Sequence, residues 1–217
     1  MTLRILLTGF EPFGGDIMNP SQALAEALHG QCVDGAPVTG LVLPCVFDAA
    51  LDMLHQALEV HRPTLVLALG QAGGRADLSL ERVAINVNDA RIPDNAGRQP
   101  IDTPVVPGGP AAYFSTLPIK AIVAELHAAG LPASVSQTAG TFVCNHVFYG
   151  LMHALATRHP RARGGFMHVP LLPGQAACLA QPTASMALQT MRDGVLVALR
   201  TALRERVDRV VGGGALD

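Results

Sequence analysis

Apolar and polar positions along the chain follow two periods, one typical of buried strands and one typical of amphipathic helices. Apolar runs of strand length predict strands at 4–8, 38–42, 64–69, 133–137 and 165–169, with a further extended stretch at 78–87. Apolar residues at helical spacing predict helices at 22–29, 48–60, 118–129, 142–157 and 184–206. Asn19, Pro20 and Ser21 supply the cap and first-turn proline of the first helix.

Strands that alternate with helices need crossover connections, which join parallel neighbours. The pattern therefore predicts an α/β fold: a three-layer α/β/α sandwich around a mainly parallel, twisted sheet. No internal repeat, low-complexity tract or linker divides the 217 residues, so we expect residues 1–217 to form a single domain.

Composition narrows the classes of protein and partner. With 49% hydrophobic and 15% charged residues the chain is too apolar to be disordered, yet no apolar run reaches the roughly 18 residues of a membrane span. A net charge of −2 gives no general attraction for nucleic acid or a membrane surface, so small molecules or peptides are the expected partners. No export signal is visible, and a cytoplasmic location is expected. Four isolated cysteines suggest neither a metal site nor a disulfide framework.

In such folds, ligands bind where strands end and turn into helices. The glycine-rich turns at 9–15 and 70–75 match neither a P-loop nor a dinucleotide fingerprint, so nucleotide binding is weakly supported. The simpler interpretation is that these glycines allow tight strand exits. Phe10 and Phe13, however, flank a proline in the first turn, where an apolar pocket wall is plausible.

Cys144 is the candidate nucleophile. The preceding residues 139–141 interrupt a strand and begin a helix, with Thr141 as a candidate cap, so Cys144 falls in the first helical turn. Free amides and the helix dipole would there favour a thiolate and could receive an oxyanion. The alternative is an inert core cysteine, the role expected for Cys32, Cys45 and Cys178.

His168 is the candidate base among eight histidines. It ends an apolar strand at the sheet edge where Cys144 is expected, and imidazole can both take and return a proton near neutral pH. His146, two residues past Cys144 on the same helix, should point elsewhere. The alternative for His168 is a core histidine with satisfied hydrogen bonds.

Glu81 is the candidate acceptor that orients the imidazole. It lies in a largely apolar extended stretch, where an unpartnered carboxylate would be costly to bury. The alternative is an ion pair with Arg82 or Arg75 on a solvated face.

Five sequence blocks together resemble the pyroglutamyl peptidase I family, also called pyrrolidone-carboxylate peptidase. They are TGFEPFGG at 8–15, ERVAIN at 81–86, RIPDN at 91–95, AGTFVCN at 139–145 and GFMHVP at 165–170. The blocks occur in family order over most of the chain. The resemblance implies a cysteine peptidase that removes N-terminal pyroglutamate from peptides, with Glu81, Cys144 and His168 as its triad. It also implies a cytosolic α/β/α enzyme that forms a homotetramer and needs no metal or organic cofactor.

The resemblance also implies a set of substrate-binding residues. The lactam ring would be walled by Phe10, Phe13, Ile92, Phe142 and Val143. Backbone around Gln71, together with Asn19, would hydrogen-bond the lactam amide, and Arg91 would lie near the oxyanion site. Asp16 stands where family members often have an apolar residue, a role that Ile17 or Met18 could take, and Cys45 stands at a position that is often not a thiol.

Two other functions are compatible with the fold class. One is a phosphorylase or transferase whose glycine-rich turns bind phosphate, which phosphate-dependent turnover would reveal. The other is a peptide-binding domain without catalysis, which would bind without turnover. Neither accounts for a cysteine at a helix start together with a histidine at a strand end.

Overall fold

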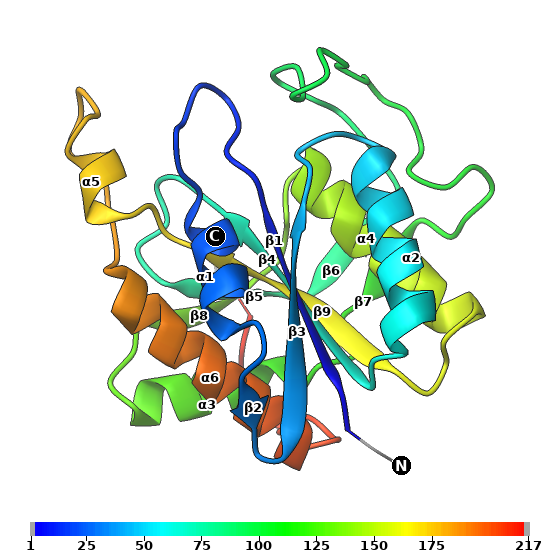
Figure 1. The fold of residues 1–217 in the computed structure, drawn as a ribbon, viewed down its shortest axis with the longest axis vertical. Coiled ribbons are helices and arrows are strands. Elements are labelled where there is room, and N and C mark those ends of the chain that lie inside the picture. Colours follow the sequence, from blue (N-terminus) through cyan, green and yellow to red (C-terminus); the bar gives the residue numbers. More distant parts are fainter. Residues whose placement is uncertain (1–2, 215–217) are drawn as a thin grey trace.

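A seven-stranded sheet forms the centre of the molecule, in the order β2-β3-β1-β4-β9-β5-β8 (Figure 1). The structure, a computed structural model, describes residues 3–214. The strands of this sheet are β1 Ile5–Phe10, β2 Cys32–Val33, β3 Ala36–Leu43, β4 Leu65–Gln71, β5 Leu78–Glu81, β8 Ala133–Ser136 and β9 Arg163–Val169. A separate ribbon pairs β6 Val83–Ile85 with β7 Ala112–Phe114.

Strand direction divides the sheet into two parts. The neighbours β3, β1, β4 and β9 are parallel, which confirms the mainly parallel sheet. Beyond β9, however, β5 runs antiparallel to it, and β8 follows the direction of β5. The predicted extended stretch at 78–87 is broken at Arg82, whose amide donates to the Ser136 carbonyl (2.9 Å) while its own carbonyl accepts from the Ser115 amide (2.9 Å). The chain therefore leaves the main sheet immediately after Glu81.

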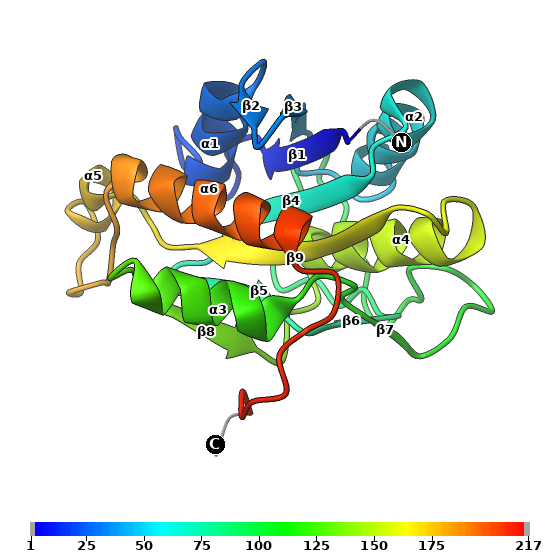
Figure 2. The ribbon, with the colours of Figure 1, turned by 90° about the horizontal axis from the view of Figure 1, so that it is seen from below.

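Helices cover both faces of the sheet, which confirms the three layers. They are α1 Pro20–Leu28, α2 Ala49–His61, α3 Ile119–Ala128, α4 Val143–Thr157, α5 Pro173–Ala176 and α6 Leu188–Arg204. α1, α3 and α6 lie on one face and α2 and α4 on the other (Figures 1 and 2). Within residues 3–214, no helix is long and apolar enough to cross a membrane.

The start of α1 follows from its sequence. Asn19 has an extended backbone, and its side-chain oxygen accepts from the Ser21 amide (3.0 Å), while Pro20 occupies the first helical position. This confirms the predicted cap and proline, which satisfy the geometry of a helix start without an unpaired donor.

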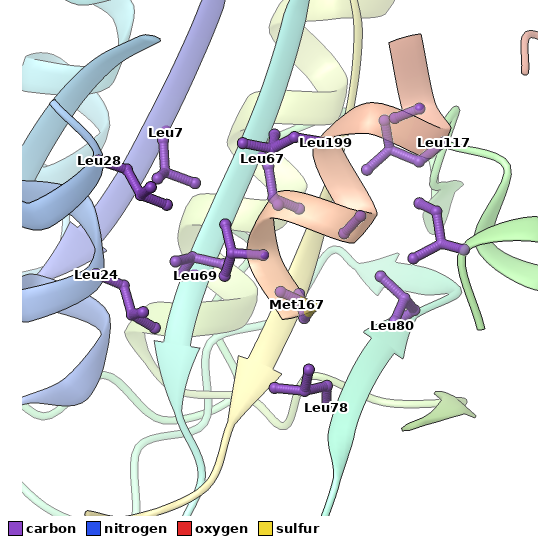
Figure 3. Close-up of a cluster of buried hydrophobic side chains, with 14 of the residues drawn as sticks. Leu7, Leu24, Leu28, Leu67, Leu69, Leu78, Leu80, Leu117, Met167 and Leu199 are labelled. Atoms are coloured by element: carbon purple, nitrogen blue, oxygen red, sulfur yellow. The ribbon is translucent and has the colours of Figure 1, made fainter. Parts of the chain in front are cut away.

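Alternation along the strands sorts side chains between the two faces. Leu65, Leu67 and Leu69 of β4 face α1 and α6, where they pack with residues such as Leu24 and Leu199 (Figure 3). The residues between them face α2 and α4. Because both faces are covered, the strands are nearly continuous apolar runs. The next β4 residue on the α4 side is Gly70, which has no side chain, and the candidate site lies above it.

Candidate active site

Glu81 and His168 form a buried hydrogen-bonded pair on the α4 side of the sheet. In the antiparallel register Glu81 lies opposite Phe166, so it shares a face with Phe166 and His168. His168 Nδ1 lies 2.7 Å from Glu81 Oε1, and the side chains are 5% and 0% exposed. A carboxylate can only accept, so Nδ1 carries the hydrogen. Within residues 3–214 the structure records no hydrogen bond to Nε2, which leaves that nitrogen available as a base.

The ion pair considered for Glu81 is also present, but it is not on a solvated face. Arg75 Nη1 lies 2.7 Å from Glu81 Oε1, and the carboxylate is fully buried. Arg82 points away and donates instead to the Gly213 carbonyl (2.6 Å). The alternative of a solvated ion pair is therefore wrong, because one oxygen of a buried Glu81 accepts from both His168 and Arg75.

Cys144 lies in the first turn of α4, as predicted, but the cap differs. The N-cap is Phe142, which has no side-chain cap hydrogen bond. Thr141 is not the cap, because its hydroxyl donates to the Asp89 carbonyl (2.7 Å). The first amides of a helix have no partner within it, and no side chain caps them here. They remain available to an anion beside Cys144.

Gly70 leaves room for the Cys144 sulfur beside the strand that carries His168. A Cβ at Gly70 would come 2.8 Å from both Cys144 Sγ and the Phe166 ring, so the sulfur rests on the bare backbone of β4. Gly70 is the register partner of His168 on the adjacent strand β9, and the two share a face. The thiol therefore lies over the strand next to the imidazole.

The chain reaches this position by a route that periodicity did not predict. Cys144 was expected to follow a strand that ends at the same edge as β9. The preceding strand, β8, instead runs antiparallel to β9 and ends at Ser136, level with Glu81. The loop at 137–142 then returns across the face of the sheet to begin α4.

Asn145 fastens the start of α4 and was missed by the sequence analysis. Its side-chain amide donates to the carbonyls of Ile85 (2.9 Å) and Val87 (3.0 Å), and its oxygen accepts from the Ile85 amide (3.0 Å). These hydrogen bonds join residues about 60 positions apart in the sequence. The sequence could have indicated this role only through the polarity of Asn145 at the start of an apolar helix.

Burial sets the protonation of the two reacting groups. It raises the pKa of the Cys144 thiol, with Cys45 and Glu81 acting in the same direction and Arg75 against them. It also lowers the pKa of His168, although the Glu81 hydrogen bond opposes this. The resting site therefore holds a thiol beside a neutral imidazole. These directions oppose the thiolate expected at the helix start, although Cys144 itself keeps part of its surface exposed.

The apolar residues assigned to the pocket divide into two groups. Phe13 and Phe142 are half-buried with ring centroids 6.0 Å apart, and Ile92 is half-buried as well. Phe10 is not in the turn: it ends β1, is 2% exposed and packs on Phe166 (6.5 Å). Val143 is likewise fully buried. Phe10 was expected in the turn that follows the first strand, but β1 continues through Gly9 to Phe10.

The side chain of Asn19 forms hydrogen bonds within the loop between β1 and α1. Its oxygen accepts from the amide and the hydroxyl of Ser21 (3.0 and 2.7 Å), and its nitrogen donates to the Glu11 carbonyl (3.1 Å). Asn19 is 3% exposed. It therefore holds the loop between β1 and α1, and its side-chain nitrogen uses one of its two hydrogens to do so.

Gln71 belongs to a polar cluster at the rim that the sequence analysis did not foresee. Its side-chain nitrogen donates to Asp16 Oδ2 (2.9 Å), and Gln175 Nε2 donates to Gln71 Oε1 (3.0 Å) and to the same Asp16 oxygen (3.1 Å). The loop after β1, the end of β4 and the short helix α5 that follows β9 meet here. Arg91 is exposed, in a segment tied to the start of α4 by the hydrogen bond from the Asp89 amide to the Thr141 carbonyl (3.0 Å).

No group of three His, Cys, Asp or Glu side chains gathers as a metal site within the part of the chain that the structure describes. Cys45 is buried, and burial with nearby Glu11 and Asp94 raises the pKa of its thiol to about 12. Cys32 and Cys178 are exposed and lie outside the site.

The sequence and the fold are both similar to known proteins. Residues 3–205 match the family model described as pyroglutamyl peptidase. A pyrrolidone-carboxylate peptidase of Klebsiella pneumoniae (strain 342) is 59% identical over 212 residues, which cover 97% of this chain and 98% of that protein. One from Cupriavidus taiwanensis is 60% identical over 215 residues, covering 98% of each chain.

Solved structures give the same result. A crystal structure of pyroglutamyl peptidase I from Bacillus amyloliquefaciens superposes with a TM-score of 0.94 at 45% identity, covering 98% of this chain and 100% of that one. A mutant pyrrolidone carboxyl peptidase from Pyrococcus furiosus superposes with a TM-score of 0.91 at 43% identity, covering 93% and 99%.

Proposed function

The chain belongs to the pyroglutamyl peptidase family, and from that premise we propose that Cys144, His168 and Glu81 carry out its chemistry in named roles. The protein is a cysteine peptidase that removes N-terminal pyroglutamate from peptides. Cys144 is the nucleophile, His168 is the general base and acid, and Glu81 orients the imidazole.

This assignment rests on the hydrogen bonding of the His168 imidazole, which uses only one of its two ring nitrogens. Nδ1 donates to Glu81 at 2.7 Å, so Nε2 carries no hydrogen. His168 lies opposite Gly70 on the adjacent strand, and the Cys144 sulfur lies over Gly70. As Sγ attacks the carbonyl carbon of pyroglutamate, His168 Nε2 takes the thiol proton. The oxyanion that forms is received by the uncapped amides at the start of α4.

The tetrahedral intermediate then collapses. The amide C–N bond breaks as the imidazolium returns its proton to the leaving amine, and a thioester to Cys144 remains. Water, deprotonated by His168, attacks the thioester carbon, and Sγ leaves with the returned proton. Pyroglutamate and a shortened peptide are the products. Because the site rests as a neutral pair, Nε2 first passes the thiol proton to the leaving amine and later passes a proton of the water to the departing sulfur.

The lactam ring is compact and neutral, which suits an apolar pocket. Phe13, Ile92 and Phe142 supply that surface, Phe10 and Val143 support it from the core, and backbone at Gln71 hydrogen-bonds the lactam amide. Arg91 lies toward the oxyanion. Asn19 keeps the loop in place and is the second candidate hydrogen-bond partner of the lactam amide. The rim carboxylate Asp16 already accepts from Gln71 and Gln175.

Specificity tests this pocket. An uncyclised N-terminal Gln or Glu brings an ammonium into a site whose apolar walls offer no counter-charge. We expect kcat/KM for a pyroglutamyl amide to exceed that of the matched Gln and Glu amides by at least about 1,000-fold. Comparable rates for the open forms would contradict the neutral pocket. The Asp16→Asn variant serves as the control, because it removes the rim charge and leaves the apolar walls intact.

The triad is tested on a fluorogenic pyroglutamyl amide. We expect Cys144→Ala to lose turnover by more than about 1,000-fold, whereas Cys32→Ser and Cys178→Ser stay within about twofold of the parent. Turnover by Cys144→Ala would exclude the nucleophile assignment. Phosphate dependence of the parent would favour a phosphorolytic reaction.

Assembly and location are also proposals. Ile17, Met18 and Leu179 are exposed at 89%, 41% and 49%, and Gln175 joins the Met18 segment to the α5 region. Such apolar surface favours self-association, and we expect a homotetramer of single-domain chains in the cytoplasm. Light scattering at micromolar concentration measures the mass directly, and a monomer would exclude it.

A further inference from the structure

Arg75 joins three segments that meet at the catalytic pair. It lies in the loop between β4 and β5, and its Nη1 donates to Glu81 Oε1 at 2.7 Å. Its Nη2 donates to the Thr138 carbonyl at 3.0 Å, in the loop that leads from β8 to Cys144. One guanidinium fork therefore contacts both the orienting carboxylate and the segment that delivers the nucleophile.

The charge of Arg75 has a specific task at Glu81. The carboxylate is fully buried, and its second oxygen, Oε2, has no hydrogen-bond partner among the described residues. The resting imidazole is neutral, so its hydrogen bond adds no formal positive charge. Arg75 supplies the cation that offsets the cost of burying this carboxylate. Its own side chain is 26% exposed, so it lies between Glu81 and solvent.

We propose that Arg75 is a positioning residue, which holds Glu81 against His168 with one arm of its guanidinium and the 137–142 loop with the other. The proposal rests on the triad roles assigned above. It predicts that Arg75 acts on turnover rather than on substrate binding, and that the larger part of its effect passes through Glu81.

Substituting Arg75 with lysine or glutamine separates the effect of its positive charge from the effect of its planar guanidinium fork. Lysine keeps the positive charge but has no planar fork to hold Glu81 and Thr138 together, and glutamine keeps neither charge nor fork. Burial is the main reason that the pKa of His168 is lowered; Glu81, which faces it from β5, acts against this, and the positive charge of Arg75 in the loop lowers the pKa further. Cys144 lies over the neighbouring strand at Gly70. Without that charge the imidazole holds its proton to higher pH, so the acid limb of the pH profile moves upward.

The experiment measures kcat, KM and the pH dependence of kcat/KM for Arg75→Gln and Arg75→Lys on a pyroglutamyl amide. We expect Arg75→Gln to lower kcat by about tenfold to 100-fold, with KM changed by less than about threefold and the acid limb shifted to higher pH. Arg75→Lys should lower kcat by about threefold to tenfold and leave the acid limb in place.

Arg209→Gln is the matched control, because Arg209 is a partly exposed arginine that bridges two carboxylates, Glu125 and Glu205, and its loss should change neither kcat nor the limb. Unchanged kcat in both Arg75 variants would overturn the proposal, and so would equal losses with an unmoved limb, which indicate a merely structural role. If Arg75→Gln fails to fold, Arg75→Lys decides alone: a lowered kcat supports the proposal and a parental kcat overturns it.

A double-mutant cycle tests transmission through Glu81. Adding Arg75→Gln to Glu81→Gln should lower kcat by less than about threefold further, because the carboxylate that Arg75 holds is already gone. Fully additive losses would overturn the proposal. Turnover by Cys144→Ala would instead mean that the triad is wrong, whereas an inactive Cys144→Ala with parental Arg75 variants would exclude this inference alone.

Discussion

Two buried histidines on the same side of the sheet show how similar surroundings produce different roles. His168 in β9 and His146 in α4 are 4% and 1% exposed, and each packs on a phenylalanine. His146 uses both ring nitrogens: Nδ1 donates to Asn88 Oδ1 (2.9 Å), and Nε2 accepts from the Asp48 amide (3.1 Å). His168 uses only Nδ1. An imidazole becomes a base here because one nitrogen is left unbonded, not because it is exposed.

His146 is a structural connection with the chemistry of a catalytic residue. It ties α4 to the segment around Asn88 and to the start of α2, which are 58 and 98 residues away in sequence. Burial lowers the pKa of His146 to about 4, so it is neutral near pH 7 and accepts the Asp48 amide. The core-histidine alternative weighed for His168 therefore describes His146.

Removing the unbonded nitrogen of His168 should have the largest effect. We expect His168→Ala to lower kcat by about 10³- to 10⁴-fold while circular dichroism shows a folded protein, because both proton transfers are lost. Substantial turnover by this variant would mean that another group is the base, with His146 the next candidate.

Changing the partner of His168 should have a smaller effect. Glu81→Gln keeps the imidazole but replaces its charged acceptor and leaves Arg75 without its counter-charge. We expect kcat to fall by about 100-fold, less than for His168→Ala, because a misoriented base still acts. Steady-state kinetics on the same amide decides the order, and a loss larger than that of His168→Ala would contradict an orienting role.

Removing the structural histidine should affect folding and not chemistry. His146→Ala leaves Asn88 Oδ1 and the Asp48 amide unpaired and opens a cavity, so we expect the free energy of unfolding to fall by about 3 kcal/mol. Turnover per folded molecule should stay within about threefold of the parent. Urea unfolding measures the loss. His159→Ala, at a half-buried histidine beside Glu59, is the control, with a loss below about 1 kcal/mol. Lost turnover at unchanged stability would assign His146 to the reaction.

Lowering the pH should reduce the free energy of unfolding, because His146 is buried as a neutral imidazole. The unfolded state binds a proton near pH 6.5, whereas folded His146 binds one only near pH 4, so its contribution is complete above pH 6.5 and is lost as the pH falls toward 4. Between pH 7 and 5 we expect this group to remove about 2 kcal/mol of stability, at about 1.4 kcal/mol per pH unit. Unfolding curves at both values should show a smaller acid loss in His146→Ala. An equal loss would contradict burial of a neutral imidazole.

The sequence predicted those features that depend on neighbours along the chain. Apolar runs located the central strands, and Asn19 and Pro20 located the start of α1. The residues 139–141, which cannot continue a strand, placed Cys144 in a first helical turn. Glu81 was identified because a carboxylate in an apolar strand needs a partner, and His168 because it ends an apolar strand at the edge where Cys144 was expected. The two side chains lie 2.7 Å apart.

Tertiary structure decided which groups become partners, because that depends on contacts that periodicity does not encode. The reversed direction of β5 and β8 sets Glu81 beside His168 and sends the 137–142 loop back across the sheet. It was also decided there that Arg75 rather than Arg82 contacts Glu81, that Phe10 lies in the core, and that burial keeps Cys144 a thiol. Local pattern determines where a residue stands in its element, whereas its charge state and hydrogen bonds depend on segments brought close only by folding.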